Sequence, residues 1–554
     1  MRIPPEMLGS GACHIHRFRM TASNRSPSAD GLAPREWLFL GLVIFGWAIF
    51  VISLGKDMSW DFRNYHWYAP FAFLNGRMGF DVAVSHQATY YNPLLDIPFY
   101  WLATRLPSWV ALGTLGAVQG SNVVPLYLIA RSLLRLEERR LAAAALTLLC
   151  MTGGLTISLS GTTYYDNVMS VFVLSGLALL ITRRETLARG SLLGAATISA
   201  IAGLITGSAV GLKLPEGPYA VGFAATLALM PGDFKQRSVR LIAGGIAGVA
   251  GVALFASYWF VHMDQVTGNP LFPYFNQFFH SPLALSFSYR DTRFLPHDVL
   301  HALLYPILFG IDYRVANDLP YTDIRVGLAY VLAIATGLLW LSRKRTQDPL
   351  TAPDGARVLF TYVTATYVAW LSIFGIYRYI LTLEMLAPLV VAACVGMWPL
   401  SRRTKLTVLG VLAALVMATT RADFLERAPL GDPYVQVTLP PIPHPDNTIV
   451  LMTGEAPMGY LVPALPHRIP ILRIDGWMIQ PQDGSKLTAE TKARVKAFKG
   501  DLFVITIEYE NNRTRAALAQ YGLGFNPDAC GTIETNLGGP YEFCPLTRKA
   551  DPNP

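Results

Sequence analysis

The sequence predicts a mostly α-helical, polytopic transmembrane bundle followed by a small C-terminal α/β domain. Of the 554 residues, 52% are hydrophobic and only 15% are charged, whereas soluble domains carry about 25% charged residues. Apolar runs recur between residues 38 and 420, and many approach the roughly 20 residues needed to cross about 30 Å of hydrocarbon. After residue 420 the sequence becomes polar and rich in proline. The chain therefore belongs in a lipid bilayer.

The apolar runs predict about eleven spans. They lie near residues 38–54, 109–134, 141–159, 167–181, 191–210, 219–230, 241–261, 326–341, 358–376, 380–400 and 406–420. Residues 295–311 are also apolar, but two prolines and three ionisable residues interrupt them. We expect this segment to be interfacial or re-entrant, because a clean span excludes such residues.

Basic residues predict the orientation. They gather in short segments at residues 135–140, 183–189, 235–240, 343–357 and 402–405. Cytoplasmic loops are enriched in Lys and Arg, and eleven spans place all five segments inside together with an uncleaved, cytoplasmic N-terminal tail. We therefore expect a multi-pass protein of a bacterial inner membrane with a periplasmic C-terminal domain. The net charge of +8 then reports orientation, and no nucleic-acid partner is expected.

The domain organisation follows from these changes in composition. We expect a cytoplasmic tail at 1–35, the membrane domain at 36–420, a Pro-rich stiff connector at 421–446 and the α/β domain at 447–554. In the last domain, residues 448–452 and 502–507 read as strands and residues 488–499 and 512–521 as helices. A disulfide between Cys530 and Cys544 is expected, because an oxidising compartment permits it.

The first outer loop carries the densest group of chemically active side chains. Asp57 and Asp61 are four residues apart, which places both carboxylates on one face of a helix, with Tyr65 next on the same stripe and His66 beside it. Such a stripe suits a general base, a metal or a sugar. The alternative is an aromatic belt of ordinary interfacial residues.

Farther along this loop, His86, Tyr91 and Asn92 combine rings with hydrogen-bonding groups. Sugars are bound by such combinations, so these residues are candidate substrate ligands. A proline-terminated amphipathic helix lying in the membrane interface is the alternative.

The next two outer loops add charged residues at span ends. Asp166 stands at the mouth of two predicted spans, where ionisable side chains are costly and usually functional; a helix N-cap is its alternative role. Lys213 and Glu216 lie in a helix broken by prolines. Lys213 is placed to bind a lipid phosphate, or else to snorkel to the membrane surface.

Arg378 and Tyr379 lie between two apolar runs. Arg holds phosphate oxygens in bidentate fashion, and a structural ion pair between Arg378 and Glu384 is the alternative. The outer loops contain no HExxH, Walker or GxSxG motif, so metalloprotease, ATP-dependent and serine-hydrolase chemistry receive no support.

These residues resemble those of the GT-C superfamily of membrane glycosyltransferases, over most of residues 36–420. The resemblance rests on the acidic first loop with Asp57 and Asp61, on Asp166, on Lys213 and on the Arg378-Tyr379 pair. It implies a sugar donor linked to polyprenyl phosphate and a glycan, lipid or protein acceptor. It also implies that Asp61 or Asp57 acts as base while Lys213 and Arg378 neutralise the departing phosphate.

The first loop lacks the adjacent acidic residues of the simplest GT-C pattern. This leaves open which acid is the base and whether a divalent metal is bound. The predicted function is inverting glycosyl transfer at the outer membrane face. The rival prediction is a transporter or flippase for a lipid-linked glycan, which would use the same basic and aromatic groups as a binding path.

Overall fold

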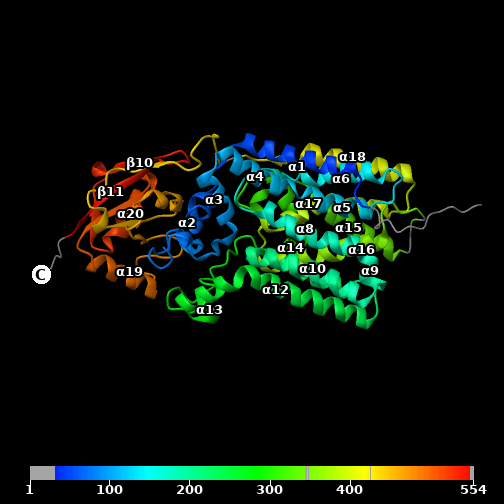
Figure 1. Ribbon diagram of the computed structural model, residues 1–554, viewed down its shortest axis with the longest axis horizontal. Coiled ribbons are helices and arrows are strands. Elements are labelled where there is room, and N and C mark those ends of the chain that lie inside the picture. Colours follow the sequence, from blue (N-terminus) through cyan, green and yellow to red (C-terminus); the bar gives the residue numbers. More distant parts are fainter. Residues whose placement is uncertain (1–30, 343–345, 347, 425, 550–554) are drawn as a thin grey trace, which may run out of the picture.

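Figure 1 shows the computed structural model, which describes residues 31–342, 346, 348–424 and 426–549. Most helices run along the long axis of the molecule, and the C-terminal sheet lies at one end (Figure 1). Helices α2 (Tyr68–Leu74) and α3 (Ile97–Arg105), both from the first predicted outer loop, lie between these two parts. The N-terminal tail expected at 1–35 lies almost wholly outside the described residues.

The helical domain contains every segment that was predicted to span. Its helices are α1 (Pro34–Leu54), α4 (Ser108–Gly120), α5 (Val123–Leu133), α6 (Arg139–Met151), α7 (Gly154–Ser158), α8 (Asp166–Thr182), α9 (Arg184–Arg189), α10 (Leu192–Leu212), α11 (Gly217–Leu229), α12 (Phe234–Thr267), α14 (Val299–Ile311), α15 (Arg325–Leu341), α16 (Pro353–Ile373), α17 (Leu381–Gly396) and α18 (Arg402–Thr419). A four-residue helix, α13 (Asn276–Phe279), lies in the long segment after α12.

Five of these segments are long and apolar enough to cross a membrane: α1, α10, α12, α16 and Tyr377–Gly396, which is α17 with the turn before it. The predicted count of eleven is not confirmed. Two predicted spans are each divided into two shorter helices, α4 with α5 and α6 with α7, and α8, α11 and α15 have 17 residues or fewer. Helix α18 carries Arg402, Arg403 and Lys405 in its first turn.

Helix α17 forms the centre of the bundle. All of its residues from Leu381 to Gly396 are buried, and it contacts α5, α6, α8, α15, α16 and α18. A helix that is mostly apolar on every side is buried in protein or in lipid, and the complete burial of α17 shows that protein surrounds it. The centre of the helical domain is therefore made of protein on every side, and a charged side chain there must find its partner within the protein.

The C-terminal domain is a seven-stranded mixed sheet with two helices. Its strands are β5 (Val437–Thr438), β6 (Thr448–Met452), β7 (Ile471–Arg473), β8 (Asp501–Thr506), β9 (Leu523–Phe525), β10 (Gly531–Thr535) and β11 (Tyr541–Arg548). They follow the order β5-β10-β11-β8-β6-β7, with β9 beside β11. Only β6 with β7 and β6 with β8 are parallel pairs. The predicted strands are present as β6 and β8, and the predicted helices as α19 (Lys486–Ala497) and α20 (Asn511–Ala519).

The first outer loop is built into the edge of this sheet. Val82 pairs with Leu472 of β7, and the buried Arg77 donates to the carbonyl of Ile469 at 2.7 Å and forms a two-pronged ion pair with Asp81. The 421–446 segment runs back over the helical domain. Its strands β3 (Arg421–Ala422) and β4 (Arg427–Ala428) pair with β2 (Tyr321–Thr322) and β1 (Lys56–Asp57). The first outer loop is thus joined to the sheet by the backbone pairing of Val82 with Leu472 and by the side chain of Arg77.

Candidate functional site

The chain after α1 turns away from the helical path predicted for it. Gly55 has a φ of +83°, and a Cβ there would lie 2.4 Å from the carbonyl oxygen of Ala428, so this close approach requires glycine. Strand β1 follows at once, and helical turns resume only around Trp60. Asp57 and Asp61 therefore do not share one helix face, and the prediction that they do is wrong.

Asp57 ties two loops together. Its side chain is fully buried. One carboxylate oxygen accepts from the Ser59 amide at 2.9 Å, and the other accepts from the amide and hydroxyl of Thr163 at 2.7 and 2.9 Å. A buried carboxylate with both oxygens bonded in this way has a structural role. It holds the loop that carries Asp166 against the first outer loop.

Asp61 instead faces the helical domain and remains partly exposed. Its Oδ2 lies 2.9 Å from Nη1 of Arg378, with 16% of the Asp61 side chain and 20% of the Arg378 side chain exposed. Tyr65 donates to the same oxygen at 3.2 Å, so the predicted stripe holds for this pair. The guanidinium carbon of Arg378 lies 4.4 Å from the centre of the Tyr164 ring. The alternative pair of Arg378 with Glu384 is not formed.

A second ion pair lies beside the first. Lys213 bonds Asp166, and its ammonium also donates to the carbonyl of Tyr164 at 2.9 Å. Both cations lie over the ring of Tyr379. The ring centre is 5.7 Å from Nζ of Lys213 and 5.4 Å from the guanidinium carbon of Arg378. We call Asp61, Asp166, Lys213 and Arg378 the loop cluster. Four separate segments of the sequence supply it.

The loop cluster keeps some hydrogen-bonding capacity unused. Oδ2 of Asp166 is buried, and no donor from the described part of the chain bonds it. Such an atom costs free energy unless a further group satisfies it.

Two further glutamates next to the cluster favour protonation. Burial raises the pKa of Glu216 to about 8, with the Asp166 charge adding to the shift and Lys213 opposing it. Burial also raises the pKa of Glu426 to about 7, helped by the charges of Asp57 and Asp61. Glu216 was predicted as a substrate ligand. Glu426 was missed, because only the folding of the 421–446 segment onto the first loop brings it here.

Aromatic rings adjoin the Asp61 side of the cluster. The Tyr65 ring centre lies 4.0 Å from that of His66 and 5.5 Å from that of Tyr91. The hydroxyl of Tyr91 bonds that of Tyr274, from the long segment after α12. His66 bonds Asp96 through Nδ1 at 2.6 Å. Tyr65, His66 and Tyr91 are therefore brought together as predicted, and Asp96 and Tyr274 join them.

Two predicted ligands make other contacts. Asn92 donates to the carbonyl of Phe255 at 2.8 Å and accepts from Tyr258 at 2.7 Å, both in α12. His86 is fully buried and stacks on Trp60 of the same loop and on Trp477 of the C-terminal domain. Their contacts fasten the first loop to α12 and to the sheet.

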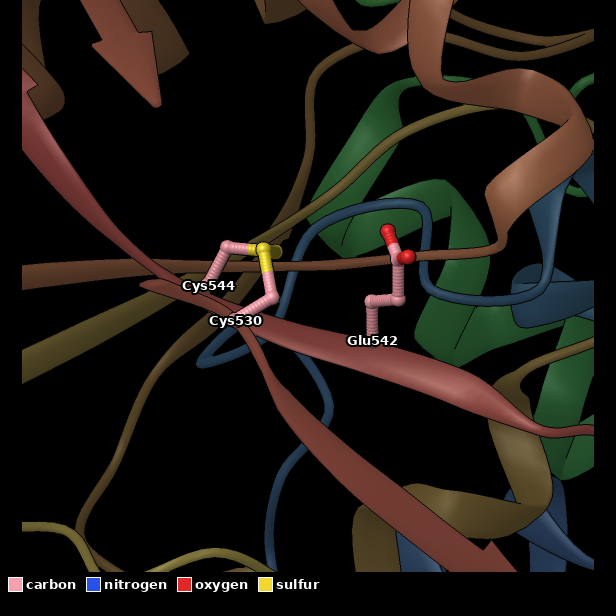
Figure 2. A group of neighbouring side chains, drawn as sticks. All are labelled: Cys530, Glu542 and Cys544. Carbon is pink, nitrogen blue, oxygen red and sulfur yellow. A yellow bond between two sulfur atoms is a disulfide. The ribbon is translucent and has the colours of Figure 1, made fainter. Parts of the chain in front are cut away.

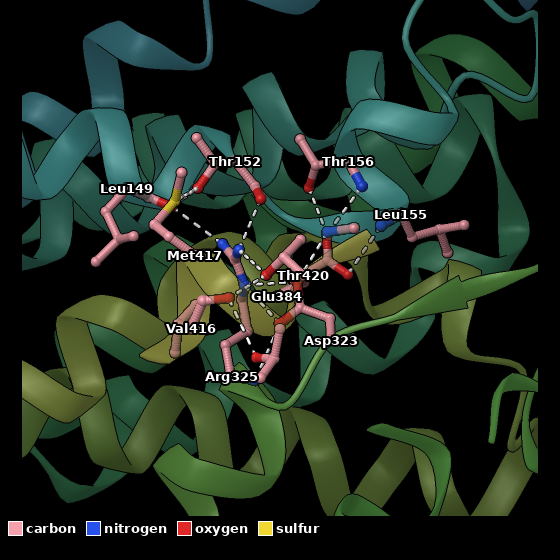
Figure 3. A network of polar contacts seen from close by, with 12 residues as sticks. Leu149, Thr152, Leu155, Thr156, Asp323, Arg325, Glu384, Val416, Met417 and Thr420 are labelled. Carbon is pink, nitrogen blue, oxygen red and sulfur yellow. Dashed lines mark hydrogen bonds and ion pairs between the residues drawn. The ribbon is translucent and has the colours of Figure 1, made fainter. Parts of the chain in front are cut away.

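A second group of charges is sealed inside the helical domain (Figure 3). We call Asp323, Arg325 and Glu384 the core network. Arg325 bonds Asp323 at 2.7 Å, with 1% or less of either side chain exposed. Glu384 accepts from the amide and the hydroxyl of Thr156 at 2.8 and 2.7 Å, and from Tyr377 at 2.9 Å. Because Tyr377 precedes Arg378, the core network anchors the turn that presents the Arg378 guanidinium.

One group of residues has the spacing of a metal site. Cys530, Glu542 and Cys544 offer ligand atoms within 4.8 Å of one another. Figure 2 shows, however, that the two sulfurs are bonded in the predicted disulfide. The bonded sulfurs supply no thiolate, so this group does not fit a zinc-type centre.

Comparisons with protein-family models, with curated proteins and with solved structures find no match for this chain.

Proposed function

We propose that this protein is an inverting membrane glycosyltransferase of GT-C type, which moves a sugar from a polyprenyl-phosphate donor to a cell-envelope acceptor. The observation that carries the proposal is the partly exposed Asp61–Arg378 pair, which lies beside a second acid–cation pair and between aromatic rings. This arrangement joins a carboxylate base, two cations for a phosphate and stacking surfaces for a sugar.

Asp61 is the proposed general base. The acceptor hydroxyl attacks the anomeric carbon and gives its proton to the Asp61 carboxylate, while the bond from that carbon to the phosphate oxygen breaks. The electron pair leaves on the phosphate, and the products are the glycosylated acceptor and polyprenyl phosphate. A positioned carboxylate contributes about 10²- to 10⁴-fold to such a step.

Arg378 and Lys213 are the proposed phosphate ligands. Each cation is held by a carboxylate in the free protein. A donor phosphate that takes over Arg378 frees Asp61 for the acceptor hydroxyl, so donor binding prepares the base. Fixed cations also stabilise the charge that develops on the leaving phosphate. The second oxygen of Asp166 is buried without a donor from the described residues, so it can accept from a sugar hydroxyl only when donor binding opens the Lys213–Asp166 pair.

The location belongs to the same proposal. Five helices are suited to crossing a membrane, and the loop cluster lies at the ends of α10 and of the Tyr377–Gly396 segment. A lipid-linked donor reaches such a position from within the bilayer. We place the loop cluster and the C-terminal domain on the periplasmic side of a bacterial inner membrane, because the basic segments favour that orientation.

The test measures sugar transfer by the purified protein in lipid nanodiscs, from a panel of synthetic polyprenyl-phosphate sugars to an envelope extract. Asp61→Asn removes the base, so we expect the rate to fall about 10²- to 10⁴-fold. Asp446→Asn changes an aspartate of the C-terminal domain whose side chain is 76% exposed and pairs with Arg468, and it is the control.

An unchanged rate in Asp61→Asn would show that Asp61 is not the base. Binding of the donors without turnover by the wild-type protein would instead favour the rival function, a transporter or flippase for a lipid-linked glycan.

A further inference from the structure

Three aromatic side chains stack where the first outer loop meets the C-terminal domain. The Trp477 ring lies over both Trp60 and His86, with ring centres 4.8 and 5.1 Å away and interplanar angles of 21° and 26°. Trp60 and His86 are themselves nearly parallel, at 11°. We call Trp60, His86 and Trp477 the aromatic platform. Its lower layer comes from the loop and its upper layer from the C-terminal domain.

The outer surface of this platform is open. The side of Trp477 that faces Trp60 and His86 is covered by their rings, yet 47% of Trp477 remains exposed. The exposed area therefore belongs to the opposite ring face and to the edges. A large indole held rigidly from below, with its other face in solvent, presents a flat apolar surface of fixed orientation.

Partly exposed polar groups border the ring. Glu455 accepts from Arg513 at 2.6 Å, with 43% of the Glu455 side chain and 36% of the Arg513 side chain exposed. Hydrogen bonds from Arg513 and from Trp477 itself hold the pKa of Glu455 below its ordinary value, although burial opposes this shift. Arg513 also bonds Asp475. The rim therefore offers fixed acceptors and donors beside the exposed indole.

The platform is connected to the loop cluster through the first outer loop and through the segment after α12. Trp60 directly precedes Asp61. Met478, which follows Trp477, packs against Phe272 and Ala284 from the long segment after α12. That segment also supplies Tyr274, which bonds Tyr91 near Asp61. The same segments thus support both the platform and the proposed base.

We propose that the aromatic platform binds a neutral sugar ring of the acceptor, so that the acceptor is an oligosaccharide. The apolar C–H face of a sugar ring stacks on the open indole face, and its hydroxyls bond the carboxylate and guanidinium of the rim. This inference rests on the proposed function, because it assigns the platform to the acceptor side of the same site. It does not require that the platform contact the donor.

Domain attachment alone does not account for the platform. The loop and sheet are already joined by the Arg77 contacts and by the pairing of Val82 with Leu472. A residue used only for attachment is best buried, as His86 is. An exposed indole with acids at its edge is instead typical of a binding surface, because tryptophan gives a large contact area with little loss of side-chain entropy.

The experiment measures binding of maltohexaose, cellohexaose and chitohexaose to the full-length protein in lipid nanodiscs by calorimetry. We expect at least one hexasaccharide to bind, and Trp477→Ala to weaken that binding about tenfold because it removes the stacking surface for the sugar ring. Trp477→Tyr keeps a ring and should restore most of the affinity. Trp101→Ala removes an equally exposed tryptophan of α3, at 47%, and should have no effect.

Failure of this inference and failure of the proposed function are distinguishable. Release of sugar from the donor to water needs the loop cluster but no acceptor, so it should persist in Trp477→Ala. The inference is overturned if none of the three hexasaccharides binds, or if Trp477→Ala binds them as tightly as the wild-type protein. Hexasaccharide binding without any donor cleavage would support the platform and contradict the proposed function.

Discussion

The loop cluster and the core network are built from the same chemical groups but differ in access. Each contains two carboxylates with arginine. In the core network every carboxylate is fully buried and accepts backbone amides or hydroxyls. In the loop cluster Asp61 and Arg378 stay partly exposed, and one oxygen of Asp166 has no donor from the described residues. The difference fits a structural role for the core network, and it supports the proposal that the loop cluster exchanges its partners for a ligand.

The largest expected effect is a loss of stability when the core network is broken. Arg325→Ala leaves the Asp323 carboxylate buried without its cation, which should cost about 3–5 kcal/mol of folding free energy. Arg314→Ala is the matched control, because Arg314 follows Asp312 with the same two-residue spacing but is 75% exposed. Thermal unfolding in detergent measures both variants. Equal melting temperatures would contradict the structural role of the core network.

The second prediction addresses the cation of the loop cluster. Arg378→Gln removes a charge-assisted contact to phosphate, worth about 1.5–3 kcal/mol, so we expect KM for the donor to rise about 10- to 100-fold with little change in melting temperature. Arg378→Lys should recover part of this loss because it restores the charge. A lower melting temperature with unchanged KM would show that Arg378 has a structural role, like the residues of the core network.

Asp57 and Asp61 lie in the same loop, so substituting each one separates a structural carboxylate from the proposed base. Asp57→Asn places an amide against the Thr163 donors, so it should cost about 1–3 kcal/mol of stability. The rate of transfer per folded molecule should be unchanged, in contrast to Asp61→Asn. Thermal unfolding and transfer assays on the same preparation separate these outcomes, and a loss of rate without a loss of stability would make Asp57 the base.

The last prediction is a dependence of stability on pH. The pKa of Glu426 rises on folding from its ordinary value of 4.5 to about 7, so the folded state binds this proton more tightly. The stabilisation is complete below pH 4.5 and is lost as the pH rises towards 7. Glu426→Gln should flatten this part of the curve of melting temperature against pH. Glu490→Gln, at an exposed position, is the control, and an equal slope in both variants would refute the assignment.

Sequence patterns located all four members of the loop cluster because they stand near the ends of apolar runs. Asp61, Asp166, Lys213 and Arg378 were each recognisable as costly charges beside a membrane segment. The pattern failed at Asp57, where the four-residue spacing suggested a helix but Gly55 and strand β1 impose another path. It also failed at Glu426, which lies in a segment that looked like a stiff connector and in fact folds back to pair with β1.

The sequence by itself determined that the chain is rich in apolar helices, where several of them end, and that a separate sheet domain with a disulfide follows. These properties depend on the composition and spacing of neighbouring residues. Only the tertiary structure decided which charge meets which: Arg378 bonds Asp61 across 317 positions of the chain, while Glu384 bonds Thr156 and Tyr377. Electrostatic attraction depends on distance in space, and sequence separation does not set the distance between packed helices.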